Sequence, residues 1–259
     1  WTPDVYEGAP TPVAAFFASA PKVAAMGLFL RVALDAFSGM VADWRQIVIF
    51  MAIASMFLGA VGAIGQSNVK RLLAYSSINN FGFVLIGLAA ASAAGASAVL
   101  LYLAIYLVMT LGAFLCVLAL TDVDGKPVER LEDMAGLART RPWLATAISI
   151  FMLSLAGLPP LFGFMAKLAV FNAAVDSGLW LLAVLGVIAS VVAAYYYLRV
   201  VKILFFDEPA GVVVTGPGGG SAAVNQGMMV AAAVFCSPVG YLALGPLTEA
   251  TRLAASSLF

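Results

Sequence analysis

Residues 97–120 read SAVLLYLAIYLVMTLGAFLCVLAL, a run without any charged side chain. A helix rises about 1.5 Å per residue, so about 20 residues cross a hydrocarbon core about 30 Å thick. The run is therefore long and apolar enough to form a transmembrane helix. About seven segments of the chain meet this criterion, near residues 12–34, 46–65, 70–92, 97–120, 142–175, 178–206 and 225–246.

The composition agrees with a chain that lies in lipid. Of the 259 residues, 63% are hydrophobic and 10% are charged, whereas a soluble domain carries roughly 25% charged residues. We therefore predict an all-α, polytopic transmembrane bundle that forms a single membrane domain over residues 1–259 and contacts the lipid bilayer. The 13 basic and 13 acidic residues balance, which gives no support for a nucleic-acid partner.

Cysteine and histidine usage argues against a metal or redox centre in the chain. Histidine is absent, and Cys116 and Cys236 both lie inside apolar runs, where free cysteine behaves as a small hydrophobic residue. A zinc, haem or iron–sulfur site needs more of these ligands. We expect no cofactor and no metal in this chain. The chain starts at Trp1 rather than Met, so we expect an N-terminal part of the protein to be missing.

Basic residues predict the orientation in the membrane. They concentrate in the connections after the second, fourth and sixth segments, namely Lys70, Arg71, Lys126, Arg130, Arg139, Arg141, Arg199 and Lys202. The opposite side carries Arg45 and Arg252, with Arg31 near a helix end. By the positive-inside rule, the richer side is cytoplasmic.

Two connections have features of their own. In residues 121–141, apolar residues at helical spacing predict a short helix, lying either on the membrane surface or packed on the bundle; they are Val128, Leu131, Met134, Leu137 and Ala138. Residues 216–221 read GPGGGS, a composition typical of a flexible linker.

Lys22 and Lys167 are the charged residues that lie well inside predicted spans. Lys22 follows Pro12 by ten residues, which is roughly 15 Å along a helix. A charge at the bilayer centre costs at least about 2.5–3.5 kcal/mol, so such residues are usually kept for function. The alternative is a lysine whose stem reaches the interface, but both lysines lie far from a segment end. Lysine suits proton transfer, because burial favours its neutral form and a nearby carboxylate favours its charged form.

The fifth segment is too long for one straight crossing and contains Pro159 and Pro160. Each proline removes a backbone donor and clashes with the preceding turn, so we predict a helix broken there rather than merely kinked. Broken helices at membrane depth often line ion sites, and Lys167 follows this break.

Polar, uncharged side chains lie between the lysines. Tyr102 and Tyr106 are four residues apart and share one helix face. Ser76, Ser77, Asn79 and Asn80 lie in the third segment. These side chains either support a water-filled proton path or only hydrogen-bond helices together.

Several separate motifs, in order, resemble the antiporter-like membrane subunits of respiratory complex I. They are residues 1–13 (WTPDVYEGAPTPV), Ala20-Pro21-Lys22, residues 68–78 (NVKRLLAYSSI), Gly157-Leu158-Pro159-Pro160, Gly163-Phe164 and Lys167. Within that family, residues 5–8 (VYEG) and 111–114 (LGAF) are most similar to the branch formed by subunit N of the bacterial enzyme. The resemblance covers essentially the whole chain.

The resemblance implies the carboxy-terminal half of a fourteen-helix fold in the bacterial inner membrane. It implies proton translocation driven by quinone reduction elsewhere, with FMN, iron–sulfur clusters and quinone in partner subunits and other membrane subunits of complex I as partners. Lys22 matches the family's central lysine and Lys167 the lysine towards the proton exit. A glutamate and a further lysine would lie upstream of Trp1 and supply the carboxylate that the spans here lack.

The chain departs from the family pattern in two places. Residues 78–83 read INNFGF where relatives often carry a histidine. Because this chain has no histidine for a proton relay, Asn79 or Asn80 would hold water there instead. Thr110 stands where an asparagine is common. Two other functions stay open. One is a Na⁺/H⁺ antiporter subunit, since those proteins share the helical core, and the other is a purely structural membrane spacer.

Overall fold

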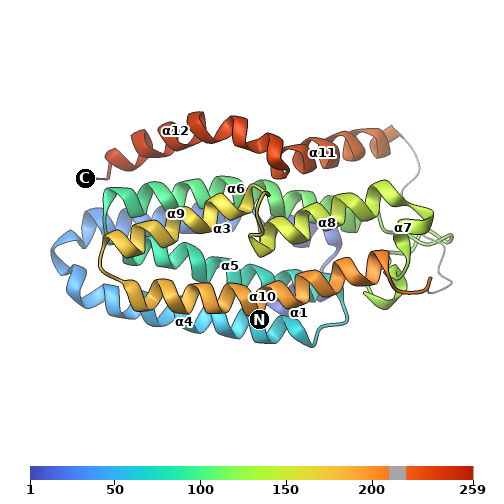
Figure 1. Cartoon of the computed structure of the whole chain (residues 1–259), viewed down its shortest axis with the longest axis horizontal. Coiled ribbons are helices and arrows are strands. Elements are labelled where there is room, and N and C mark those ends of the chain that lie inside the picture. The colour runs from blue at the N-terminus through green and yellow to red at the C-terminus, as the bar shows by residue number, and fades with distance from the viewer. Residues whose placement is uncertain (210–219, 259) are drawn as a thin grey trace.

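The computed structural model describes residues 1–209 and 220–258, with the side chains of 220–222 left out. The described part is a bundle of helices with no strand (Figure 1). Five helical segments are long and apolar enough to cross a membrane, namely Thr11–Ala36, Ser38–Ile64, Val69–Ala89, Ala93–Leu118 and Trp180–Phe205. The predicted all-α, multi-pass membrane bundle is confirmed. Most of the predicted linker, residues 216–219, lies outside the described residues.

The first membrane segment is interrupted, although the sequence predicted one helix over 12–34. After the short α1 (Thr2–Gly8), α2 (Thr11–Ala18) ends at Ser19 and α3 (Ala20–Arg31) follows, with a π turn over Val32–Ala36. Pro21 has no N–H to donate to the Phe17 carbonyl, and at the end of α2 the Ser19 hydroxyl donates to the Ala15 carbonyl at 2.7 Å. Lys22 therefore lies directly after a break.

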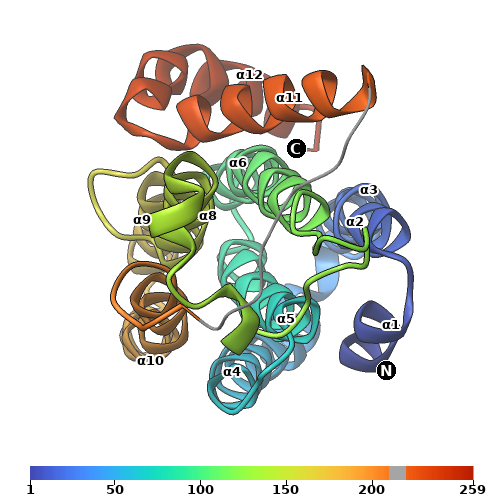
Figure 2. The same ribbon diagram turned by 90° about the vertical axis from the view of Figure 1, so that its right-hand side faces the viewer.

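Helix α5 (Val69–Ala89) lies in the centre of the bundle, beside α4 (Val41–Ile64) and α6 (Ala93–Leu118) (Figure 2). Its start is capped by the Asn68 side chain, which accepts from the N–H groups of Lys70 and Arg71. Because its neighbours surround it, α5 is buried on nearly all sides. Large apolar side chains of α4 and α10 (Trp180–Phe205) point outward, such as Phe50 and Val191.

The fifth segment is broken, as the paired prolines predicted. Helix α8 (Pro142–Ala156) ends before the prolines and α9 (Gly163–Asp176) begins after them. A continuous helix would bond the carbonyls of Leu155 and Ala156 to the N–H groups of residues 159 and 160. Both of those residues are proline, so these carbonyls lose their helical donors.

The seventh segment is a bent pair and differs from the single helix predicted near 225–246. Helix α11 (Gly220–Cys236) is followed by a 3₁₀ turn (Pro238–Ala243) and α12 (Leu244–Ser256), with a bend of 71° between the two parts. Pro238 ends α11 as Pro159 ends α8. The two breaks touch, because the Phe162 N–H donates to the Cys236 carbonyl at 3.0 Å. In Figure 1, α11 and α12 lie along one side of the bundle, beside α6.

The connection over 121–141 differs from the predicted short helix. It contains only a 3₁₀ turn (Glu132–Met134) and a single α-helical turn, α7 (Leu137–Thr140). Ala138 of the predicted apolar pattern is only partly buried. The other four side chains are at most 5% exposed: Val128, Leu131, Met134 and Leu137. Gly136 adopts φ +68° and breaks the helical pattern, while its N–H donates to the Ile203 carbonyl at 3.0 Å.

Candidate functional site

Lys22 lies at the start of α3 and points towards α5 and α6. Its ammonium donates to the Ser77 hydroxyl, which also accepts from Tyr106 OH at 2.8 Å. The ammonium nitrogen lies 4.9 Å from the centre of the Tyr6 ring and 5.6 Å from that of Phe81. Aromatic faces stabilise a cation without binding its proton. Lys22 is partly exposed in this chain.

Lys167 is 4% exposed and lies at the break between α8 and α9. Its ammonium donates to the Ala156 carbonyl and to the Ser190 hydroxyl, both at 2.8 Å. The Ala156 carbonyl is available because Pro160 cannot donate to it. The face of the Phe83 ring lies 4.3 Å from the same nitrogen. The broken helix thus supplies the backbone acceptor that holds Lys167.

A second polar cluster lies between the two lysines. Asn80 donates to Tyr197 OH at 3.0 Å and accepts from Tyr102 OH at 2.8 Å. The hydroxyls of Ser76 and Tyr197 lie 2.5 Å apart. These four side chains are at most 2% exposed. They connect α5, α6 and α10 in the centre of the bundle.

The clusters follow one another across the bundle. Ser76 and Ser77 are adjacent on α5, and Tyr102 and Tyr106 are one turn apart on α6, so the first and second clusters are neighbours. Tyr197 and Ser190 lie on α10 seven residues apart, about 10 Å along the helix. The order is Lys22, the Ser77 cluster, the Asn80 cluster and Lys167. We call this row of polar side chains the polar axis.

Asn79 lies outside the polar axis. Its amide donates to the Met56 carbonyl on α4 at 2.7 Å, and its carbonyl oxygen is buried without a partner among the described residues. Of the two asparagines that the sequence offered, Asn80 therefore lies between the lysines. Ser76, Ser77, Tyr102 and Tyr106 all belong to the axis.

Tyr197 and Ser190 belong to the polar axis, although the sequence did not single them out. In the sequence they are distinguished only as polar residues within the apolar run of α10, and Tyr195 and Tyr196 are polar residues in the same run. Gly157 was noted only as part of a motif. Its φ is +79°, and a Cβ at this position would lie 2.7 Å from Cδ of Lys167, so the absence of a side chain leaves room for that lysine.

The end of the bundle with most basic residues holds several close ion pairs. Lys70 is buried and pairs with Glu129 at 2.7 Å, and Arg71 contacts both Asp4 and Glu7 at 2.7 Å. These pairs join α1, the start of α5 and the 121–141 connection. Asp4 and Glu7 therefore neutralise Arg71 at this surface.

Neither axis lysine has a carboxylate within ion-pair distance in the part of the chain that the structure describes. The same residues contain no group of three or more His, Cys, Asp or Glu placed to hold a metal ion. The chemistry open to the polar axis is hydrogen bonding and proton transfer among lysines and hydroxyl groups.

Comparison with known proteins identifies the fold and the family. The family profile described as "NADH:quinone oxidoreductase/Mrp antiporter, TM" matches residues 1–193. NADH-quinone oxidoreductase subunit N of Rhizorhabdus wittichii is 56% identical over 260 residues, covering 100% of this chain and 53% of that protein. The same subunit of Erythrobacter litoralis is 57% identical over 259 residues, covering 100% and 52%.

Solved structures agree with this family assignment. A chain of respiratory complex I from Thermus thermophilus superimposes with a TM-score of 0.80 at 35% identity, covering 96% of this chain and 53% of that one. A chain of the Mrp complex from Dietzia shares the fold, with a TM-score of 0.85 at 23% identity, covering 100% and 55%. The chain spans about half the length of the curated relatives it matches. The resemblance to complex I subunits, and to subunit N among them, is confirmed: the chain belongs to the NADH:quinone oxidoreductase/Mrp antiporter transmembrane family.

Proposed function

We propose that this chain carries part of the proton path of a bacterial NADH:quinone oxidoreductase. The observation that carries the proposal is the polar axis, in which two lysines at membrane depth are held by neutral groups and have separate clusters of buried hydroxyl and amide side chains between them. An uncompensated ammonium in this position is costly. A site that must release a proton benefits from that cost, because burial brings the charged and neutral forms of lysine closer in free energy.

In this proposal Lys22 receives a proton and passes it along the axis to Lys167. Each hydroxyl of Ser77, Tyr106, Tyr102 and Ser76 can accept one proton while it donates another. Water molecules would bridge the gaps between clusters. Like charges disfavour each other, so protonation of Lys22 would favour release of a proton from Lys167. The partly exposed side of Lys22 is where a carboxylate from the rest of the protein would act.

The energy for this transfer would come from outside the chain. The names of the relatives place them in an enzyme that oxidises NADH and reduces quinone. FMN, iron–sulfur clusters and quinone would lie in partner subunits, and other membrane subunits of the complex in the bacterial inner membrane would contact this one. The lysines and hydroxyls of this chain perform no redox step themselves.

Proton uptake by membrane vesicles tests the proposal. We expect Lys22→Ala and Lys167→Ala to reduce NADH-driven proton uptake several-fold in assembled enzyme, because each removes a proton-carrying group from the axis. Lys126→Ala is the matched control, since that side chain is 74% exposed in a connection, and uptake should stay normal. Normal uptake and normal NADH oxidation in both axis variants would favour a structural spacer instead.

The second candidate is a subunit of a Na⁺/H⁺ antiporter complex. The match to the Mrp fold favours it, and the family profile includes both classes. Purification of the complete protein from its native membrane separates the two functions. Co-purifying flavin and iron–sulfur subunits support the first, whereas Na⁺-dependent proton exchange without those subunits supports the second.

A further inference from the structure

A pocket of about 310 Å³ lies between α6, α8 and α11, at the end of the bundle that carries most of the basic residues. Three membrane helices end or begin beside it: α6 ends at Leu118, α8 begins at Pro142 and α11 begins at Gly220. The pocket therefore lies near the membrane surface rather than at the midplane. It is separate from the polar axis and plays no part in the proposed proton path.

The pocket has a cationic wall. Arg141 lines it, and one terminal guanidinium nitrogen of Arg141 is buried without a hydrogen-bond partner among the described residues. No acidic residue lines the pocket in the part of the chain that the structure describes. Leaving a buried charged donor unpaired is costly, so the Arg141 guanidinium, which lines the pocket, favours an anionic ligand there.

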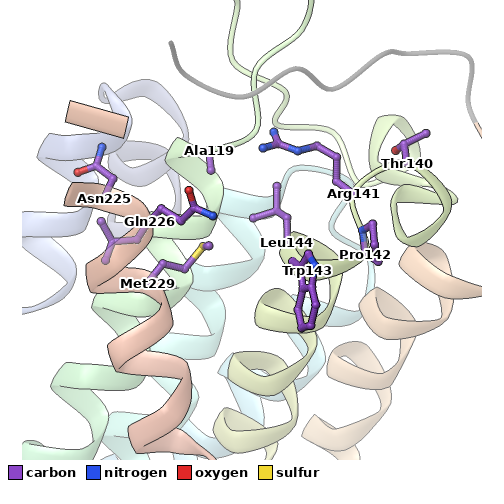
Figure 3. A pocket seen from close by; sticks show the side chains of 10 residues that line it. Ala119, Thr140, Arg141, Pro142, Trp143, Leu144, Asn225, Gln226 and Met229 are labelled. Carbon is purple, nitrogen blue, oxygen red and sulfur yellow. The ribbon is translucent and has the colours of Figure 1, made fainter. Parts of the chain in front are cut away.

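The other walls combine amide and apolar side chains. Figure 3 shows Gln226 of α11 and Arg141 at the start of α8 extending towards the same space from opposite sides. Asn225 adds a second amide, while Leu115 and Met229 supply apolar surface. Trp143 lies two residues after Arg141 and is 84% exposed, as is typical of tryptophan at the boundary between lipid and water.

We propose that this pocket binds the phosphodiester headgroup of an anionic phospholipid. Arginine binds phosphate oxygens through several N–H groups at once, and the Gln226 and Asn225 amides can donate to the remaining oxygens. The acyl chains would lie along the apolar surface of Leu115 and Met229. Basic pockets between membrane helices on the cytoplasmic side suit such headgroups, and this end is the one that the basic residues predict to be cytoplasmic.

Lipid binding to the complete subunit in its complex tests the assignment. After removal of bound lipid in detergent, native mass spectrometry would compare phosphatidylglycerol with phosphatidylethanolamine of the same acyl chains. We expect preferential binding of phosphatidylglycerol, and a loss of about tenfold or more in Arg141→Gln, since a hydrogen bond to a charged group is usually worth at least that factor. Arg139→Gln is the matched control, because Arg139 is exposed and does not line the pocket; it should bind within about twofold of the unchanged protein.

Three outcomes would overturn the proposal. They are equal binding of the two lipids, unchanged phosphatidylglycerol binding in Arg141→Gln, and displacement of the lipid by millimolar inorganic phosphate, which would indicate a site for free anions. Should Arg141→Gln fail to fold, Gln226→Leu replaces it, because Gln226 is exposed on the surface of α11 and its loss should also weaken binding. Arg141→Lys should retain charge but bind more weakly than arginine.

Discussion

Gly157 controls the position of Lys167 in two ways. Its φ of +79° belongs to the left-handed region, which residues with a side chain rarely adopt. A Cβ at this position would also lie 2.7 Å from Cδ of Lys167, which is too close for carbon atoms. The turn that ends α8 and the placement of the lysine therefore depend on the same glycine.

We expect Gly157→Ala to reduce proton pumping and to destabilise the protein, because it adds both backbone strain and a clash with the lysine stem. Gly178→Ala is the matched control: its φ is +76°, and nothing lies within 4 Å of the added Cβ. It should cost only about 1–2 kcal/mol of strain and leave pumping unchanged. Equal pumping in the two variants would show that the contact with Lys167 is unimportant.

Tyr197 joins the Ser76 and Asn80 side chains through one hydroxyl. We expect Tyr197→Phe to slow proton translocation several-fold, because the axis loses a group that both donates and accepts. Tyr195→Phe removes the same hydroxyl from the same helix at a side chain that is 59% exposed, and proton uptake should not change. The measurement is NADH-driven proton uptake by vesicles, normalised to assembled enzyme.

At the scale of single residues, the sequence identified the two lysines more clearly than it identified the polar groups between them. A lysine deep in an apolar run is conspicuous wherever it points, so Lys22 and Lys167 could be chosen without a structure. Asn79 and Asn80 could not be ranked, because α5 is buried on nearly all sides and presents no apolar face to distinguish inward from outward. Only the packing of α4 against α5 shows that the Asn79 amide donates to the Met56 carbonyl.

Helices α4 and α5 approach closely because of glycine. A Cβ on Gly82 would lie 2.7 Å from the Met56 backbone nitrogen and 2.9 Å from the Ala52 carbonyl oxygen. Membrane helices often pack in this way, because small residues let backbones come together and increase van der Waals contact. The hairpin that positions Ser76, Ser77 and Asn80 relies on this approach.

We expect Gly82→Ala to destabilise the complete protein by about 1–3 kcal/mol, since the two backbones must separate. Gly27→Ala in α3 is the matched control, because its added Cβ meets nothing within 4 Å. There alanine should be neutral or stabilising by up to about 1 kcal/mol, as alanine favours helix. Unfolding by denaturant in detergent would measure both; equal stability would contradict the close-packing explanation.

The connection over 121–141 is held to α5 by the pair between Lys70 and Glu129. We expect Glu129→Ala to cost about 3 kcal/mol, because it leaves the buried ammonium of Lys70 without its carboxylate. Asp124→Ala breaks a pair whose side chains are 68% and 74% exposed, so it should cost less than about 1 kcal/mol. The same unfolding measurement decides between them, and equal losses would mean that burial of Lys70 is not decisive.

At the scale of helices, some of the breaks could be predicted from the sequence and others could not. The paired prolines at 159 and 160 remove consecutive donors, and that break could be predicted. Breaks at Ser19 and Ser237 each depend on a single proline close by, Pro21 and Pro238, and single prolines are often accommodated by a kink. The contact between the α8–α9 break and the α11–α12 break involves residues far apart in sequence, so no local sequence pattern predicts it.

At the scale of the whole molecule, the connections that carry most of the basic residues lie at the same end of the bundle, and the assignment of this end to the cytoplasm stays a prediction. The turn at Asn68, the 121–141 connection and the end of α10 lie at one end of the bundle, joined by contacts such as Arg199 to the Ile64 carbonyl at 2.8 Å. The polar axis runs between α3, α5, α6, α9 and α10, crossing the bundle from Lys22 to Lys167. Its first lysine is partly exposed. Its second lysine is 4% exposed and lines, together with Ser190, a pocket beside the α8–α9 break.

The number of protons translocated per NADH oxidised, measured in vesicles with the assembled enzyme carrying Lys167→Ala, tests the proton-path claim most directly. We expect this ratio, the rate of NADH oxidation or both to fall clearly below those of the unchanged enzyme, because a proton that reaches the end of the axis has no group to receive it. The Lys126→Ala enzyme should keep the normal ratio and rate. An unchanged ratio and an unchanged rate in assembled Lys167→Ala enzyme would contradict a role for this axis in proton translocation.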